Sequence, residues 1–363
     1  MVFSELAKKI EDILKQNSNL LIYIQGSPDP DAMASSFALQ QLARRYGCEG
    51  VIAAMSGPSL PQNRELMEKI GIHFDVWKSL PPLSKYDGYA ILDYQTAKVQ
   101  DLSSKLPCLI HIDHHVEADD EVEVQLKFLS AEVGSTSTVL AHLVKELQPG
   151  FNEEMMKRIA TALVFGIQND TDNYTHASKL DYDALEFLAA YSDSSLLTSI
   201  MDVPLSGETV RLLRKAVSGQ VCYRDWIMAG VGYVEENNRD SIAIISDFLL
   251  NNNDVEMVVV FALVFKDNHN KLQLDASFRT NEEDFDLDYL IKEITSDGGG
   301  RQYKGAYQVN LDYFSFCPDM DKLWDVVHMT TIEALKKKRD VIHLVELKSF
   351  YHRFRVRLRN LFK

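Results

Sequence analysis

The length, composition and charge of the chain exclude several classes of protein before any motif is considered. Its 363 residues are long for one hydrophobic core and suit two domains. The 46% hydrophobic and 25% charged residues are typical of a globular protein and exclude a disordered or fibrous one. The formal net charge of −15 argues against sequence-independent binding to duplex DNA, whose phosphates are also negatively charged.

The cysteines and the apolar runs predict a cytoplasmic protein. Cys48, Cys108, Cys222 and Cys317 show no C-x-x-C spacing, which favours buried thiols over zinc ligands or a disulfide framework. The first residues are charged and amphipathic and lack the apolar core of a signal peptide. Because the most apolar run, Met257–Phe265, is too short for a bilayer, we expect no membrane span.

Two acidic residues lie in the loop of the first predicted strand–loop–helix unit. Leu20–Ile24 predicts a strand, and the prolines of 25–31 end it. An apolar stripe predicts a helix over 32–46. Asp31 lies near the start of this helix, where the helix dipole favours an anion. A helix cap accounts for one of Asp29 and Asp31, but not for both.

Two further strands end in acidic residues or histidines. Tyr86–Leu92 is followed by Asp93, and Pro107–Ile112 by Asp113–His115. Strands that alternate with helices indicate βαβ units and a mainly parallel sheet, whose ligands lie at the carboxyl ends of the strands. A polar strand end that faces solvent is the alternative for any one of them. Because Asp29 also follows a strand, we expect one edge of the sheet to collect these groups around a divalent cation and a phosphate.

Two helix ends later in the chain carry more polar groups. Gly-Ser-Thr-Ser at 134–137 begins a predicted helix that ends near Leu147, and its hydroxyls and amides cap the helix or receive a phosphate. An apolar helix over Glu153–Ile167 gives way to Gln-Asn-Asp-Thr-Asp-Asn at 168–173, whose acceptors suit a cation or water. Asp170 is therefore either a cap for the next turn or a further ligand.

Small and polar residues at Ser192–Gly207 mark the predicted domain boundary. The second domain is predicted to be α+β, with a hairpin of Val255–Phe265 and Leu272–Arg279. The amides of Gly298–Gly300 approach an anion closely, or form a flexible turn. We expect a first domain over 1–200, a linker over 201–218, a second domain over 219–330 and a basic C-terminal helix or tail over 331–363.

The C-terminal segment differs in charge from the rest of the chain. From Thr330 to Lys363 there are ten Lys and Arg residues against three Asp and Glu residues. A terminal helix that packs its apolar residues on the body or on another subunit explains this composition. An arm that contacts RNA or a membrane is the alternative.

With these motifs in order, the chain resembles the DHH phosphoesterase family, in particular RecJ-like proteins of the oligoribonuclease and 3′-phosphoadenosine 5′-phosphate phosphatase type. The family's first motif usually reads His-x-Asn-Pro-Asp-x-Asp-Ala, and Gln25–Ala32 stands in its place. Asp93, Asp113–His115 and Asp170-Thr171 fit the second, third and fourth motifs. The second domain resembles the DHH-associated C-terminal domain, with Ser277–Arg279 and the glycine run where that domain contacts substrate.

The resemblance implies an α/β fold, with a mainly parallel sheet flanked by helices, a smaller α+β domain and a cleft between them. It also implies two divalent cations, Mn²⁺ first and Mg²⁺ as the alternative, since oxygen ligands with imidazoles suit these ions. The implied site residues are Asp113, His114 and His115 for catalysis; Gln25, Asp29, Asp31, Asp93, His114 and Asp170 for metal; and His115, Ser135, Thr136, Arg279, Gly298, Gly299, Gly300 and Arg301 for substrate.

Two positions depart from the family pattern. Gln25 replaces a histidine that would bind the first cation, and its amide oxygen is a weaker ligand. Arg301 replaces the histidine that follows the glycines, which keeps a phosphate donor and alters which substrate fits. These changes indicate a variant enzyme or a catalytically weakened nucleotide sensor.

The resemblance implies hydrolysis of short linear nucleotides, such as pApA, nanoRNA or 3′-phosphoadenosine 5′-phosphate, by water activated between the cations. An exopolyphosphatase or pyrophosphatase is the alternative enzyme, and a non-catalytic nucleotide sensor the alternative binding protein. A third hypothesis gives the basic tail the main role, as an RNA-binding or docking arm. The expected partner is a small phosphate ester, and a homodimer is a possible assembly.

Overall fold

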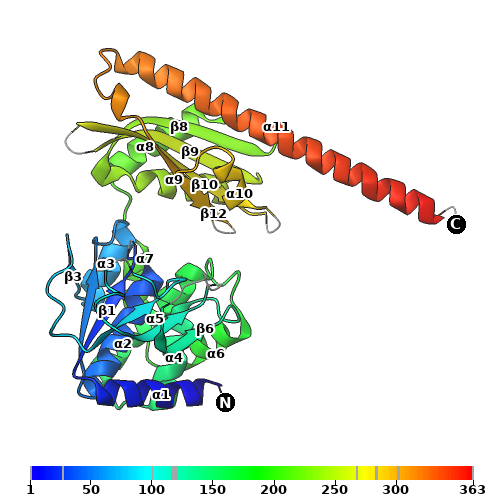
Figure 1. The fold of residues 1–363 in the computed structure, drawn as a ribbon. Coiled ribbons are helices and arrows are strands. Elements are labelled where there is room, and N and C mark those ends of the chain that lie inside the picture. The colour runs from blue at the N-terminus through cyan, green and yellow to red at the C-terminus, as the bar shows by residue number, and fades with distance from the viewer. Residues whose placement is uncertain are drawn as a thin grey trace. The chain divides into compact units, whose positions relative to one another are not determined.

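The structure is a computed structural model that describes residues 2–26, 28–99, 101–115, 122–266, 269–282, 285–300 and 303–361, with side chains from residue 3 to residue 342. The chain divides into two units, Met1–Val203 and Pro204–Lys363 (Figure 1).

The helices of the first unit are α1 (Val2–Gln16), α2 (Pro30–Arg45), α3 (Pro61–Ile70), α4 (Thr136–Leu147), α5 (Glu153–Asp170), α6 (Lys179–Ala189) and α7 (Ser194–Met201). Its strands are β1 (Asn19–Ile24), β2 (Glu49–Ala54), β3 (Asp75–Val76), β4 (Gly88–Leu92), β5 (Cys108–Asp113) and β6 (Val124–Leu129).

A parallel sheet organises the first unit. Its strand order is β3-β2-β1-β4-β5-β6, and all neighbouring strands are parallel. The chain moves outward from β1 to β3 and then continues on the other side of β1 with β4, so the direction of winding reverses between β1 and β4. Ligands of such sheets bind at the carboxyl ends of the strands near this switch point. Asp29 and Asp31 follow β1, and Asp93 follows β4.

The two faces of this sheet are covered in different ways. Leu20, Ile22 and Ile24 of β1 belong to a buried core that includes side chains of α1, α2, α4 and α5. On the opposite face, Leu21 and Tyr23 pack with the irregular segments that flank β4. Because α2 packs on both β1 and α5, the ends of these two helices are fixed relative to the edge of the sheet.

The second unit is built on a mixed sheet with the order β11-β12-β10-β9-β8-β7. Its strands are β7 (Val221–Tyr223), β8 (Trp226–Glu235), β9 (Met257–Lys266), β10 (Lys271–Thr280), β11 (Gly298–Gly300) and β12 (Lys304–Asn310), and its helices are α8 (Gly207–Gly219), α9 (Ser241–Asn251), α10 (Leu287–Lys292) and α11 (Met320–Leu361), with short 3-10 helices η1 (Glu236–Asn238) and η2 (Asp312–Phe314). Among the described strands of this second sheet, β8 and β9 pair in parallel and the other neighbours are antiparallel. Helices α8 and α9 cover one face, and α10 and α11 the other.

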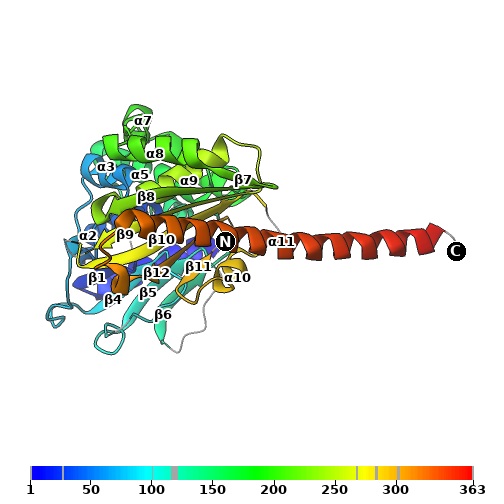
Figure 2. The same cartoon turned by 90° about the horizontal axis from the view of Figure 1, so that it is seen from above.

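Helix α11 begins well before the predicted basic tail. Figure 2 shows it crossing the second sheet and continuing past it. Leu323 and Trp324 pack on the sheet, followed by Ile332 and Leu335, because a helix that crosses a sheet must bury one apolar stripe. Arg339 of the basic run is buried and pairs with Asp225 and Glu256. Up to residue 342, the segment is therefore a helix packed on the body; the side chains beyond lie outside the described residues.

The predicted fold class, a mainly parallel α/β sheet flanked by helices plus a second sheet domain, is confirmed. The prediction of a linker over 201–218 differs from the structure, which places α8 there with Leu212 and Ala216 buried against β8 and β9. The four cysteines are free, as predicted, but only Cys48 and Cys108 of the four are buried: Cys222 is exposed, because β7 is an edge strand, and Cys317 is half-buried. Among the described residues, no helix is both long enough and apolar enough to cross a membrane.

Candidate metal centre

Asp31 is bound by the start of a helix far along the chain. It lies in the first turn of α2 and is fully buried. Its Oδ2 accepts a hydrogen bond of 2.6 Å from the backbone N–H of Thr136, and its Oδ1 one of 2.7 Å from that of Ser137. Unpaired amides and the helix dipole at the N-terminus of α4 favour this anion. Asp29, and not Asp31, caps α2, by accepting from the N–H of Ala32.

Two residues that the sequence did not single out let α4 take this position. The carboxylate of Asp181 is fully buried and accepts from the N–H of Gly134 at 2.9 Å, from the N–H of Ser178 at 2.6 Å and from the hydroxyl of Thr138. These bonds tie the start of α4 to the start of α6. Gly166 in α5 provides space, since a Cβ there would lie 3.2 Å from Asp31 Oδ1.

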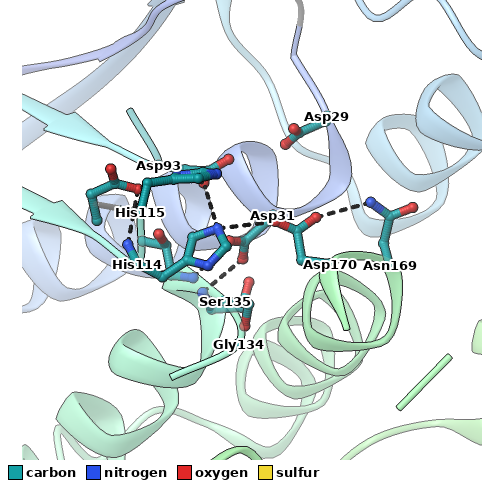
Figure 3. Close-up of polar contacts among 12 residues, drawn as sticks. Asp29, Asp31, Asp93, His114, His115, Gly134, Ser135, Asn169 and Asp170 are labelled. Carbon is teal, nitrogen blue, oxygen red and sulfur yellow. Dashed lines mark hydrogen bonds and ion pairs between the residues drawn. The ribbon is translucent and has the colours of Figure 1, made fainter. Parts of the chain in front are cut away.

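His114 lies between two acidic residues that belong to distant parts of the chain (Figure 3). Its Nε2 is 3.4 Å from Asp93 Oδ1 and 3.2 Å from Asp170 Oδ2. His114 follows β5, Asp93 follows β4 and Asp170 ends α5. The switch point of the sheet and the α2–α5 pair thus bring one imidazole and several carboxylates together, as the strand ends predicted.

Asp113 and His115 form a second contact beside this group. His115 Nδ1 lies 2.7 Å from Asp113 Oδ1, which also accepts from the N–H of His114 at 2.9 Å. His115 Nδ1 is 3.8 Å from Asp93 Oδ1. Asp113 is fully buried and therefore fixes the orientation of the His115 ring.

Asp93 has a strained backbone that its neighbours hold in place. Its φ of 54° lies in the left-handed region, which non-glycine residues rarely adopt and which clusters at functional sites. The buried His111 of β5 has its Nε2 2.8 Å from the carbonyl oxygen of Tyr94, the next residue in the chain. This contact fixes the turn that directs the Asp93 side chain toward His114.

The charges of the cluster are unbalanced. Burial and the Asp170 carboxylate raise the pKa of Asp31 to about 7, and burial with the carboxylates of Asp29 and Asp31 raises the pKa of Asp93 well above its ordinary value. Burial opposes ionisation of His114, but close contact with Asp170 and Asp93 outweighs it and raises the pKa of His114 to about 11. One imidazolium thus faces several buried carboxylates, which a bound cation would compensate.

The donor set fits a divalent cation. Asp31, Asp93, His114 and Asp170 each offer a ligand atom, and all these atoms lie within 4.8 Å of one another; Asp93, Asp113, His114 and His115 form a second group of this kind. Asp93 Oδ1, Asp113 Oδ2 and His114 Nε2 are buried and lack an aligned hydrogen-bond partner in the described part of the chain. Carboxylate oxygens with imidazoles suit Mn²⁺ or Mg²⁺ better than a thiolate-bound metal.

Other predicted residues near this centre have different surroundings. Asp29 caps α2 and is close enough to raise the pKa of Asp31 and Asp93. Gln25 follows β1 and is partly buried; its role as a ligand stays a prediction. Ser135 and Thr136 were predicted to bind substrate, but both are fully buried: the Ser135 hydroxyl caps α4 and the Thr136 N–H binds Asp31.

The described substrate residues predicted in the second unit lie on strands β10 and β11. The Arg279 guanidinium donates to Asp247 at 2.5 and 3.2 Å and to the Ser277 hydroxyl at 3.0 Å. Gly298–Gly300 do not form a flexible turn, because they pair with β12 as strand β11, and the N–H of Gly300 donates to Asp288. Arg301 lies outside the described residues.

The fold and the donor cluster together define an α/β protein with a candidate divalent-metal centre at the switch point of its parallel sheet. Residues 19–167 match the DHH family, N-terminal domain. The first unit therefore belongs to the DHH family, as its motifs predicted.

Similar proteins extend this likeness beyond the matched domain. An uncharacterized protein of Methanocaldococcus jannaschii is 32% identical over 327 residues, which cover 89% of this chain and 64% of that protein. A second uncharacterized protein of the same organism is 23% identical over 175 residues, 48% of this chain and 51% of that protein. The chain thus spans less than two thirds of the length of either relative.

A solved structure shares the fold. An exopolyphosphatase-related protein from Bacteroides fragilis superposes with a TM-score of 0.69 over 91% of this chain and 97% of that chain, at 17% identity. At this identity the likeness concerns the fold alone.

Proposed function

We propose that the protein is a metal-dependent phosphoesterase that hydrolyses short linear nucleotides, such as pApA, nanoRNA or 3′-phosphoadenosine 5′-phosphate. The observation that carries this proposal is the convergence of Asp31, Asp93, His114 and Asp170, whose ligand atoms lie within 4.8 Å of one another. These residues come from four separate parts of the first unit, and the burial of so many carboxylates costs free energy that a bound cation would offset.

The proposed cations are two divalent ions, Mn²⁺ or Mg²⁺. Asp31, His114 and Asp170 would hold one ion, Asp29 and Gln25 would hold the other, and Asp93 would bridge them. When bound, such ions supply the Lewis acidity that activates water and neutralises charge on phosphate oxygens.

The side chains around the centre have separate proposed tasks. Asp113 orients His115 through Nδ1 at 2.7 Å, which leaves Nε2 for an oxygen of the substrate phosphate. The backbone N–H groups of Thr136 and Ser137 hold the Asp31 carboxylate in place. The chain itself therefore supplies orientation and charge, and no side chain acts as a covalent nucleophile.

The second unit is proposed to recognise the rest of the substrate. Arg279 is 12% exposed at its side chain and already donates to Asp247, Ser277 and the carbonyl oxygen of Phe278. Because these bonds use most of the N–H donors of Arg279, few remain for a phosphate. We therefore expect Arg279 to contact a single terminal phosphate of a small substrate.

Product release from pApA in the presence of Mn²⁺ tests the proposal. We expect the wild-type protein to release AMP, and we expect Asp170→Asn to lose activity at least about a hundredfold because a ligand of the centre is removed. Asp12→Asn is the matched control, since Asp12 is an exposed carboxylate on α1, and it should behave as the wild type.

The same assay separates the alternative functions. Polyphosphate or pyrophosphate turnover that greatly exceeds pApA turnover would replace the nucleotide substrate with the inorganic one. Tight binding of pApA without release of AMP, with either Mn²⁺ or Mg²⁺, would favour the sensor that the change at Gln25 suggests. No turnover of any of these compounds, together with no binding, would refute the proposed function.

A further inference from the structure

A cavity lies at the far end of the two helices that carry metal-centre residues. It has a volume of ≈ 290 Å³ and is lined by Phe37, Gln40, Gln41 and Arg44 of α2, Gly71 and His73 after α3, and Met155 and Arg158 of α5. Helices α2 and α5 run antiparallel: Asp31 lies near Gly166, whereas Phe37 lies under Arg158. Arg44 is thirteen residues from Asp31 in the same helix, or about 20 Å along its axis, so the cavity is separate from the metal centre.

The charge of the cavity is opposite to that of the protein. The chain has 53 acidic and 38 basic residues, yet the charged side chains among the described residues of the lining, Arg44 and Arg158, are both basic. The Arg44 guanidinium makes no hydrogen bond or ion pair with another residue in the described ranges and is exposed at the rim. An unpaired guanidinium in a concave site is a ready donor for an anion.

The remaining walls offer fixed polar groups and an apolar surface. Gln40 and Gln41 are each 6% exposed; Gln40 donates to the carbonyl oxygen of Gly50 at 3.0 Å and accepts from Gln41 at 3.1 Å. Arg158 is anchored by the carbonyl oxygens of Ile70 and Gly71 and lies 5.3 Å from the ring centre of Phe37. The cavity is therefore preorganised by its own hydrogen bonds.

We propose that this cavity binds a small organic phosphate of about the size of a nucleoside monophosphate. Arg44 holds the phosphate at the rim, and the half-buried Met155 and Arg158 side chains of the lining receive the organic part. The volume of ≈ 290 Å³ lies just below the usual range for ligand pockets, about 300–1,000 Å³, and is too small for a long polyanion. The proposal does not depend on the hydrolase activity.

Isothermal titration of the full chain in EDTA tests this site, because removal of free divalent cations silences a metal-dependent phosphate site. The titrants are AMP, adenosine, inorganic phosphate and citrate. We expect AMP to bind one-to-one and more tightly than the other three. Arg44→Glu should weaken AMP binding at least about tenfold, the loss expected for a charge-assisted hydrogen bond.

Lys8→Glu is the matched control, since Lys8 is an exposed lysine of α1 in the same unit and the change in net charge is the same. It should leave AMP affinity within about twofold of the wild type. Equal loss in both variants, or no AMP binding to the wild type, would overturn the proposal. Citrate or adenosine that binds as tightly as AMP would also overturn it, by removing the phosphate as the recognised group.

The titration tests the Arg44 cavity, and the pApA assay tests the proposed hydrolase function, so either proposal can be refuted without the other. A protein that binds AMP through Arg44 but releases no AMP from pApA would keep this inference and lose the proposed function. A protein that releases AMP from pApA but whose AMP binding does not depend on Arg44 would keep the proposed function and lose this inference.

Discussion

The substitution Gly166→Ala tests how Asp31 is held in the metal centre. A Cβ at Gly166 would overlap the Ser137 hydroxyl and would lie 3.1 Å from Ser137 Cβ and 3.2 Å from Asp31 Oδ1. Because Ser137 is fully buried, the start of α4 must shift to make room. Overpacking of this kind costs about 1–3 kcal/mol, against a gain of about 1 kcal/mol from the better helix propensity of alanine.

Gly57→Ala is the matched control for this change. Gly57 lies in the loop after β2 of the same unit, and nothing lies within 4 Å of the position of its Cβ. Alanine at such a position stabilises a protein by about 0.4–1 kcal/mol through the unfolded state. In the free energy of unfolding, measured by urea denaturation followed by circular dichroism, Gly166→Ala should therefore be less stable than Gly57→Ala by about 0.4–3 kcal/mol.

The affinity for Mn²⁺ supplies a second readout of Gly166→Ala. Movement of α4 carries the amides that hold Asp31, and changes of this kind around metal ligands typically weaken binding by about 10–100-fold. Calorimetric titration should show this loss for Gly166→Ala and no loss for Gly57→Ala. Equal stability of the two variants, with equal Mn²⁺ affinity, would refute the role assigned to Gly166.

Three further substitutions test other parts of the structure. Asp93→Asn removes a buried carboxyl group whose charged form is disfavoured by burial and by the carboxylates of Asp29 and Asp31, so it should raise the Tm of the metal-free protein by a few degrees and abolish the rise in Tm that Mn²⁺ causes; a lower metal-free Tm with an intact Mn²⁺ response would contradict the metal role. Burial lowers the pKa of His142 below its ordinary 6.5, so the neutral imidazole stabilises the fold above about pH 6.5 and this contribution is lost as the pH falls. Between about pH 7 and pH 5 the Tm of the wild type should therefore fall more steeply than that of His142→Gln, and parallel curves would exclude this contribution. Arg339→Met leaves Asp225 and Glu256 without their buried partner and should lower the free energy of unfolding by about 2–4 kcal/mol, whereas Lys337→Met, at an exposed position of the same helix, should change it by less than about 0.5 kcal/mol; similar values for the two would show that the ion pairs contribute little.

The strand ends were the most predictable part of the fold. The runs that became β1, β4 and β5 are almost wholly buried, and such short apolar runs bounded by polar residues mark strands of a parallel sheet. Because parallel strands share one carboxyl edge, the sequence also located Asp93 and the Asp113–His115 motif. The Asp31 carboxylate was placed in the right region but with the wrong partner: it binds the amides of α4 instead of those of its own helix.

Other elements were missed for reasons that the structure explains. Helix α7 is short, and α8 lies in a stretch that was taken as a linker, because the small and polar residues before it suggested a boundary. Strand β6 has alternating Val124, Leu126 and Phe128, a period-two signal that was available in the sequence. Strand β11 consists of three glycines, whose pairing with β12 no propensity could have indicated.

The supporting residues of the metal centre were beyond sequence reasoning for a physical reason. Asp181 forms a capping box with Ser178, and this local task gives no sign of its hydrogen bond to Gly134, which is 47 residues away in the sequence. Gly166 reads as an ordinary glycine in a helix until Ser137 and Asp31 are seen against it. His111 was read only as part of a strand, although it contacts the carbonyl oxygen beside Asp93.

Anomalous diffraction from crystals grown with Mn²⁺ tests the central claim most directly. We expect an anomalous peak bounded by carboxylate oxygens of Asp31, Asp93 and Asp170 and by His114 Nε2, and the loss of this peak in crystals of Asp170→Asn. Crystals in which Mn²⁺ binds elsewhere, while these four side chains remain free of any peak, would contradict it.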